Sequence, residues 1–102
     1  DFLLTDPERK GRLVESAVGA YLLARSKVDH FDVHWWREGA SEVDFVISQG
    51  DETVAIEVKS GRVKSLKGMA DFINRFPRSR SLVIGSNDCS VESFLRGEVA
   101  LF

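Results

Sequence analysis

The sequence contains a single cysteine, Cys89, and only two prolines among its 102 residues. A lone cysteine excludes an internal disulfide and suits a reducing compartment, so we expect a cytoplasmic protein. No apolar run approaches the 18 residues typical of a membrane span, and no signal-peptide pattern is visible, which disfavours membrane insertion and secretion. Phosphate-cradling glycine loops, nucleophile elbows and redox cysteine pairs are also lacking.

An excess of basic residues is missing as well, because the formal net charge is −2 at pH 7. This value argues against a general nucleic-acid binder. The charges are unevenly spread, however: residues 59–80 contain seven lysines and arginines but one acid, Asp71, and therefore carry +6. Such a segment suits a phosphate backbone, but it is equally compatible with charged side chains that simply face solvent.

The length fits one compact domain spanning residues 1–102. Hydrophobic residues make up 43% and charged residues 29%, which is typical of a globular chain. There is no initiating methionine, and two terminal segments, residues 2–4 and 100–102, are apolar. We therefore expect a domain from a longer protein.

The pattern of apolar residues predicts an α/β fold. Asp6 and Pro7 suit the N-cap and first position of a helix, which continues to about Lys27 and is apolar around much of its circumference, so it is expected to be largely buried. Strands are expected over 30–36, 42–48, 53–59 and 81–85, with a final edge strand over 99–102. Helices are expected over 65–76 and 91–95. The α-β-β-β-α-β order predicts a mixed sheet flanked by helices.

Acidic residues interrupt two of the expected strands. Asp44 stands in one of them, and Glu57 and Lys59 lie two residues apart in the next, on one face. Two carboxylates and an ammonium group can hold a divalent cation and orient a water, as metal-assisted phosphodiester cleavage requires. The alternative is ordinary: charges on a solvent-facing side, or a cross-strand salt bridge.

Three further features of the sequence have both a functional and an ordinary structural interpretation. Glu15, in the first helix, is a candidate metal ligand or outer-shell acceptor, although the helix dipole alone favours an acid there. Consecutive Trp35 and Trp36 point to opposite faces of a strand, so at least one belongs to the core and base stacking is the less favoured use. His30 and His34 lack the further ligands of a zinc site.

Together, Glu15, Asp44 and the Glu57-Val58-Lys59 segment resemble the PD-(D/E)XK nuclease superfamily, the restriction-endonuclease-like fold. The segments 11–15, 36–37, 42–45 and 56–60 are more narrowly similar to an uncharacterised C-terminal domain of prokaryotic AAA-type P-loop ATPases. This resemblance covers about residues 11–85. The sequence departs from the superfamily pattern at one position: Val43 precedes Asp44 where the pattern has a proline.

The resemblance implies a restriction-endonuclease-like core and a metal-dependent nuclease acting on DNA. It makes Asp44 and Glu57 ligands of Mg²⁺ or Mn²⁺, Lys59 the group that stabilises the attacking water or transition state, and Glu15 a helper of the metal. It also implies a covalently linked ATPase domain that carries the nucleotide site, so we expect no ATP binding by this chain. Two alternatives stay open: a non-catalytic module that binds a protein or regulates the ATPase, and a folding unit with a vestigial site. The oligomeric state is not indicated.

Overall fold

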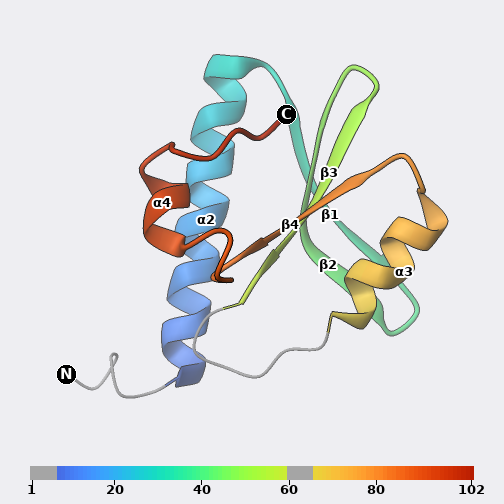
Figure 1. Ribbon diagram of the computed structural model, residues 1–102, viewed down its shortest axis with the longest axis horizontal. Helices are drawn as coiled ribbons and strands as arrows, with labels where there is room; N and C mark the ends of the chain where they lie inside the picture. The colour runs from blue at the N-terminus through green and yellow to red at the C-terminus, as the bar shows by residue number, and fades with distance from the viewer. Residues whose placement is uncertain (1–6, 60–65) are drawn as a thin grey trace.

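The computed structural model describes residues 7–59 and 66–102 (Figure 1). The elements are α2 (Pro7–Asp29), β1 (Asp32–Glu38), β2 (Ser41–Gln49), β3 (Glu52–Val58), α3 (Lys67–Arg75), β4 (Arg80–Ile84) and α4 (Val91–Leu95). This order confirms the predicted α-β-β-β-α-β succession. The expected N-cap residue, Asp6, lies outside the described residues.

The four strands form one mixed sheet in the order β1-β2-β3-β4. The first two pairs are antiparallel, and β3 and β4 are parallel. The antiparallel strands are joined by tight turns in which Gly39 and Gly50 adopt left-handed φ values of 62° and 58°. The parallel pair instead needs a crossover, which contains α3. The predicted mixed sheet is therefore confirmed.

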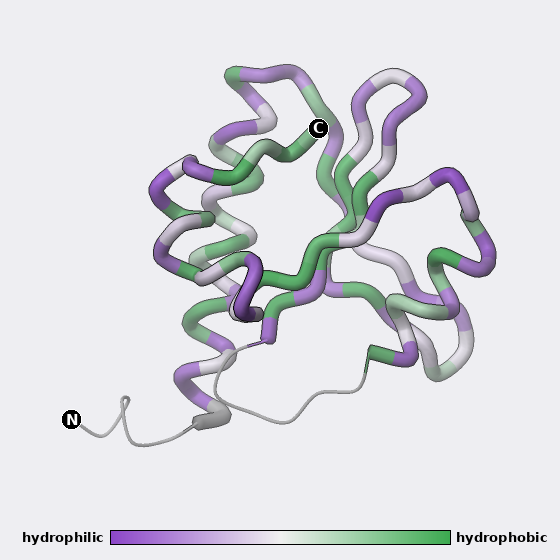
Figure 2. The backbone as a smooth tube through the Cα atoms, viewed as in Figure 1, coloured by the Kyte–Doolittle hydropathy of each residue, from purple (hydrophilic) through white to green (hydrophobic). Residues whose placement is uncertain are grey.

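Helices cover both faces of the sheet, with α2 and α4 on one side and α3 on the other (Figure 1). The α2 side buries Val18 and Leu22 against a core that includes Ile47, Ile56 and Phe94. The α3 side has its own smaller core, in which helix residues meet strand residues: Met69, Phe72, Val43, Val46 and Ala55. Figure 2 shows hydrophilic residues at the tip of the β2–β3 hairpin, away from these cores. Because β3 is central and covered on both faces, all residues from 54 to 58 are buried.

Two expectations about the flanking segments are wrong. Helix α2 is not largely buried, because Leu13 is 53% exposed and Leu23 55% exposed. Only a narrow stripe of the helix contacts the sheet. The end of the chain forms no strand; Phe102 instead packs edge-to-face on Phe31, with ring centroids 5.4 Å apart. The apolar tail thus fills the core by side-chain packing rather than by pairing with a sheet edge.

The start of α3 is fixed tightly against β2. A Cβ atom at Gly68 would collide with the carbonyl oxygen of Glu42, so only glycine permits this approach. The Ser41 hydroxyl donates a hydrogen bond to the Asp71 carboxylate, and Lys67 Nζ lies 2.7 Å from the same Oδ2 atom. The hydrogen bonds from Lys67 and Ser41 lower the pKa of Asp71 below its ordinary value.

Candidate functional site

Asp44 lies at an irregularity in β2. His34 of β1 faces Val46 and Trp36 faces Val43, so two steps along β1 correspond to three along β2. The extra residue in β2 is the signature of a β-bulge, and bulges re-aim side chains and are frequent beside active sites. The local register therefore changes where the sequence places its first candidate carboxylate.

The Asp44 carboxylate is directed at the C-terminal end of β3. Its Oδ2 atom accepts a hydrogen bond from the backbone N–H of Val58 over 2.9 Å. Val58 stands between Glu57 and Lys59. The side chain of Asp44 is half-buried, so water can still reach this position. The structure thus brings Asp44 to the Glu57-Val58-Lys59 segment, as the adjacency of the two strands predicts.

Glu57 is the most deeply buried of the candidate side chains. It is 2% exposed and faces Val83 across the parallel β3–β4 pair. Strand alternation places it on the same side as Ala55, which belongs to the α3-side core. Burying a carboxylate costs free energy unless partners or a metal compensate, and ionisable groups in such positions cluster at functional sites.

Lys59 follows directly after β3 and is exposed. Its backbone N–H donates to the Ile84 carbonyl oxygen over 2.8 Å, which continues the pairing of β3 with β4. The residue lines a cavity of about 380 Å³ together with Lys10 and Val14 of α2 and with Ser86. Lys59 is therefore at the edge of the sheet where α2 passes the carboxyl ends of the parallel strands.

Glu15 is half-buried on the stretch of α2 that passes this edge. Its neighbour Val14 lines the cavity that contains Lys59. One turn further along, a Cβ atom added at Gly19 would lie 3.1 Å from the ring of Phe45, the residue after Asp44. The helix therefore approaches both parts of the candidate site on either side of Glu15.

The described residues nevertheless contain no group of three or more His, Cys, Asp or Glu side chains arranged to hold a metal ion. The structure brings Asp44 to the segment that carries Glu57, but it does not gather Glu15 with them into a three-carboxylate cluster. Mg²⁺ often uses only one or two carboxylates and completes its octahedron with waters and substrate oxygens. Asp44 and the adjoining strand end that bears Glu57 supply two carboxylates for such a site, and the roles of the individual residues remain predictions.

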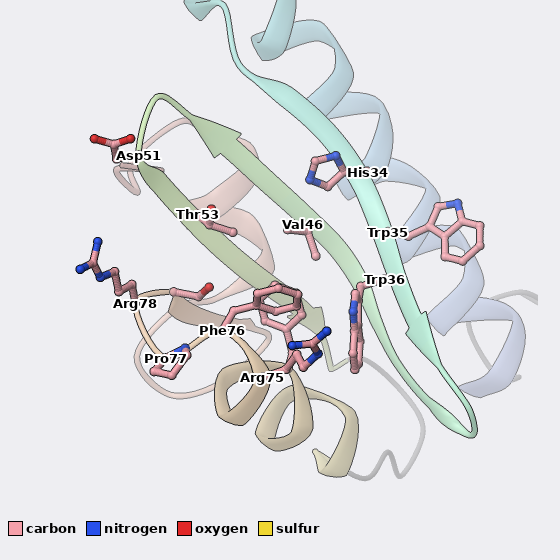
Figure 3. A pocket seen from close by; sticks show the side chains of 12 residues that line it. His34, Trp35, Trp36, Val46, Asp51, Thr53, Arg75, Phe76, Pro77 and Arg78 are labelled. Atoms are coloured by element: carbon pink, nitrogen blue, oxygen red, sulfur yellow. The ribbon is translucent and has the colours of Figure 1, made fainter.

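A second, larger cavity was not predicted. It encloses about 640 Å³ between the sheet and the end of α3, and Trp36, Arg75, Phe76 and Arg78 are among its lining residues (Figure 3). Trp36 packs on Phe72 with ring centroids 5.3 Å apart. The helical spacing of apolar residues indicates this packing, but no local pattern indicates the hollow beside it.

The two histidines lie in different surroundings. His30 adopts a left-handed φ of 59° just before β1, whereas His34 lies within the strand and lines the larger cavity. Within residues 7–59 and 66–102, no helix combines the length and apolarity needed to cross a membrane.

Comparison with known proteins gives one match. The model of a family described as "Domain of unknown function (DUF4143)" matches residues 10–97, which is most of the chain. No curated protein and no solved structure matches it.

Proposed function

The chain belongs to this family of domains of unknown function (DUF4143), and we propose that it is a nuclease-like domain that hydrolyses DNA phosphodiesters with Mg²⁺ or Mn²⁺. The observation that carries the proposal is the hydrogen bond from the Val58 N–H to Asp44 Oδ2. It holds one carboxylate beside a strand end that bears a second carboxylate, Glu57, and an exposed lysine, Lys59. These are the groups and the order found in PD-(D/E)XK nucleases.

Each residue has a defined task in this reaction. Asp44 and Glu57 would hold the cation, which would polarise the phosphate and lower the pKa of the attacking water. The ammonium group of Lys59 offsets the negative charge that develops on the phosphoryl oxygens. Glu15 acts as a positioning residue at the edge of the site, through water or through the neighbouring ligands.

Two partners follow from the proposal. Domains of this family are often found with AAA-type ATPases, which supports a covalently linked ATPase domain that carries the nucleotide site. DNA is the second partner, and the +6 segment over residues 59–80 supplies cations for its backbone. Residues 60–65 of that segment lie outside the described part of the chain.

The first test is calorimetric titration of the 102-residue chain with Mn²⁺. We expect binding by the parent and at least tenfold weaker binding by Asp44→Asn, because the amide lacks the charge that holds the cation. A plasmid-nicking assay with Lys59→Gln, matched by Lys27→Gln at an exposed helical position, then tests catalysis. Cleavage by Lys59→Gln at the parent rate would remove Lys59 from the mechanism.

A second candidate function is a non-catalytic module that regulates an AAA-type ATPase and retains a vestigial nuclease site. The absence of a three-carboxylate cluster among the described residues favours it. Glu57→Gln separates the two proposals, because it removes the charge and keeps the shape. If Glu57 binds a metal, the metal-free variant is at least as stable as the metal-free parent, and Mn²⁺ raises the stability of the parent but not of the variant. If the carboxylate is structural, the variant is less stable than the parent, and Mn²⁺ changes the stability of neither protein.

A further inference from the structure

The larger cavity has the chemistry of a ligand site and is separate from the acidic residues. Its volume of about 640 Å³ falls within the range of small-molecule pockets. Strand β1, the β2–β3 hairpin and the C-terminal end of α3 surround it (Figure 3). Thr53 lines it and lies four residues before Glu57 on the same face of β3, a separation of about 13 Å.

One wall of the cavity is aromatic. Phe72 is buried and supports the wall from behind, with its ring centroid 5.3 Å from that of Trp36 and 4.9 Å from that of Phe76. Trp36 is half-buried and Phe76 is 41% exposed. The supporting packing fixes their orientation, so both rings present surface to the cavity without needing to be ordered by a ligand.

Two guanidinium groups accompany the aromatic wall. Arg75 lies over the Phe76 ring, 5.5 Å from its centroid, and its Nε atom is 3.7 Å from Glu38 Oε2. That ion pair is well exposed and therefore holds Arg75 only weakly. Arg78 lies further along the rim, and none of the ion pairs between described residues involves it. Among the described residues that line the cavity, Asp51, on the hairpin, is the one acid.

We propose that this cavity binds an unpaired nucleotide of single-stranded DNA. The base stacks on Trp36 and Phe76, and the adjoining phosphates are bound by Arg75 and Arg78. Aromatic platforms beside cations are the recurring means of binding single strands, because every base offers a π face and every nucleotide a negative charge. An apolar peptide would fill the same hollow but would offer no negative charge to Arg78, and Arg75 would keep only its exposed ion pair with Glu38. The inference rests on the proposed function only for the class of ligand, a DNA strand.

The chain has two tryptophans, and in Figure 3 the Trp36 ring faces Phe76 while the Trp35 ring points to the other side of β1, so the emission of Trp36 reports on the cavity and that of Trp35 is background. The probes are a ten-residue oligothymidylate and an abasic strand of the same length and charge, titrated in EDTA so that no metal-dependent step intervenes. We expect the oligothymidylate to quench the emission and to bind at least tenfold more tightly than the abasic strand. The Trp35→Phe variant removes the more exposed emitter, which is 71% exposed, and assigns the signal to Trp36.

Variants on the cavity rim make the test specific. Phe76→Ala weakens oligothymidylate binding about tenfold through lost stacking. Arg78→Gln lowers the slope of log K against log salt by about 0.7, the value for one phosphate contact on a single strand. Arg96→Gln makes the same charge change at an exposed position outside this cavity and leaves both quantities unchanged.

Several results would overturn the proposal. Equal affinity for the two strands would show charge attraction without a base site, and parent-like binding by both Phe76→Ala and Arg78→Gln would place the strand elsewhere. Binding of a hydrophobic dye without any response to DNA would assign the hollow to an apolar partner. The Asp44→Asn variant keeps the two proposals distinct: it retains oligothymidylate binding here even if the acidic site proves inactive.

Discussion

Replacing Asp44 by asparagine and by alanine separates the structural task of this carboxylate from its proposed chemical one. Asparagine keeps a side-chain oxygen that can accept the Val58 N–H, whereas alanine leaves that donor without its acceptor. Val58 is 2% exposed, so the loss falls on a backbone group in a buried stretch of β3.

The expected sizes follow from this environment. An unsatisfied buried donor costs about 1–3 kcal/mol, and the half-exposed position of Asp44 favours the lower part of this range for the alanine variant. In a domain of this length each kcal/mol lowers the midpoint of thermal unfolding by about 4–8 °C. The asparagine variant exchanges a charge-assisted hydrogen bond for a neutral one and should lose less than about 1 kcal/mol.

Urea unfolding and Mn²⁺ calorimetry on the same three proteins provide the assay. We expect the free energy of unfolding to fall in the order parent, asparagine, alanine, while both variants lose metal binding. Equal stability of the two variants would contradict the hydrogen-bond argument. Parent-like Mn²⁺ binding by the asparagine variant would remove Asp44 from the proposed ligand set, whatever its stability.

Three further predictions concern other parts of the fold. Gly68→Ala should lower the free energy of unfolding by about 1–3 kcal/mol or more in urea titrations, because the added methyl group meets backbone that cannot move aside; stability equal to the parent would contradict this. Because the pKa of Asp71 is lowered, this carboxylate stabilises the fold at pH values above its ordinary pKa of 3.8. The stabilisation is lost as the pH falls through the lowered pKa of the folded state. NMR titration should therefore show the Asp71 pKa rising towards 3.8 in Ser41→Ala and Lys67→Gln. Burial raises the pKa of the Cys89 thiol, so a thiol reagent at pH 8 should react slowly with folded protein and rapidly in denaturant; fast reaction without denaturant would contradict the burial of this side chain.

The order of elements was predictable because each one carries a local signal. The strands are short apolar runs separated by turn residues, and the expected limits of β2 and β3 differ from the observed ones by one residue. The helix expected over 65–76 ends at Arg75, shortly before Pro77, a residue that cannot continue a helix. Burial was harder to predict, because the exposure of Leu13 and Leu23 depends on which elements pack around α2 and not on the helix sequence itself.

Part of the candidate site was likewise predictable from the sequence, and part was not. Adjacency of Asp44 to the Glu57–Lys59 segment follows from two consecutive antiparallel strands, and the structure has that adjacency. The hydrogen bond of Asp44 to a backbone N–H does not follow, because a sequence pattern does not show the conformation of a side chain that lies at a bulge, where the β1–β2 register moves by one residue. The larger cavity also lacked a local signal, since its walls come from segments that are distant in the sequence.

The topology explains why the acidic residues lie where they do. A parallel pair such as β3–β4 must be covered on both faces, and ligands in such sheets are bound beyond the carboxyl ends of the strands. Glu57 is the penultimate residue of β3 and Lys59 follows the strand, so both are at that end. The larger cavity lies toward the opposite end of β3, beside the β2–β3 hairpin, and α3 packs on the face between the two places. A DNA strand bound at both would therefore pass over α3, whose first and last residues, Lys67 and Arg75, are basic.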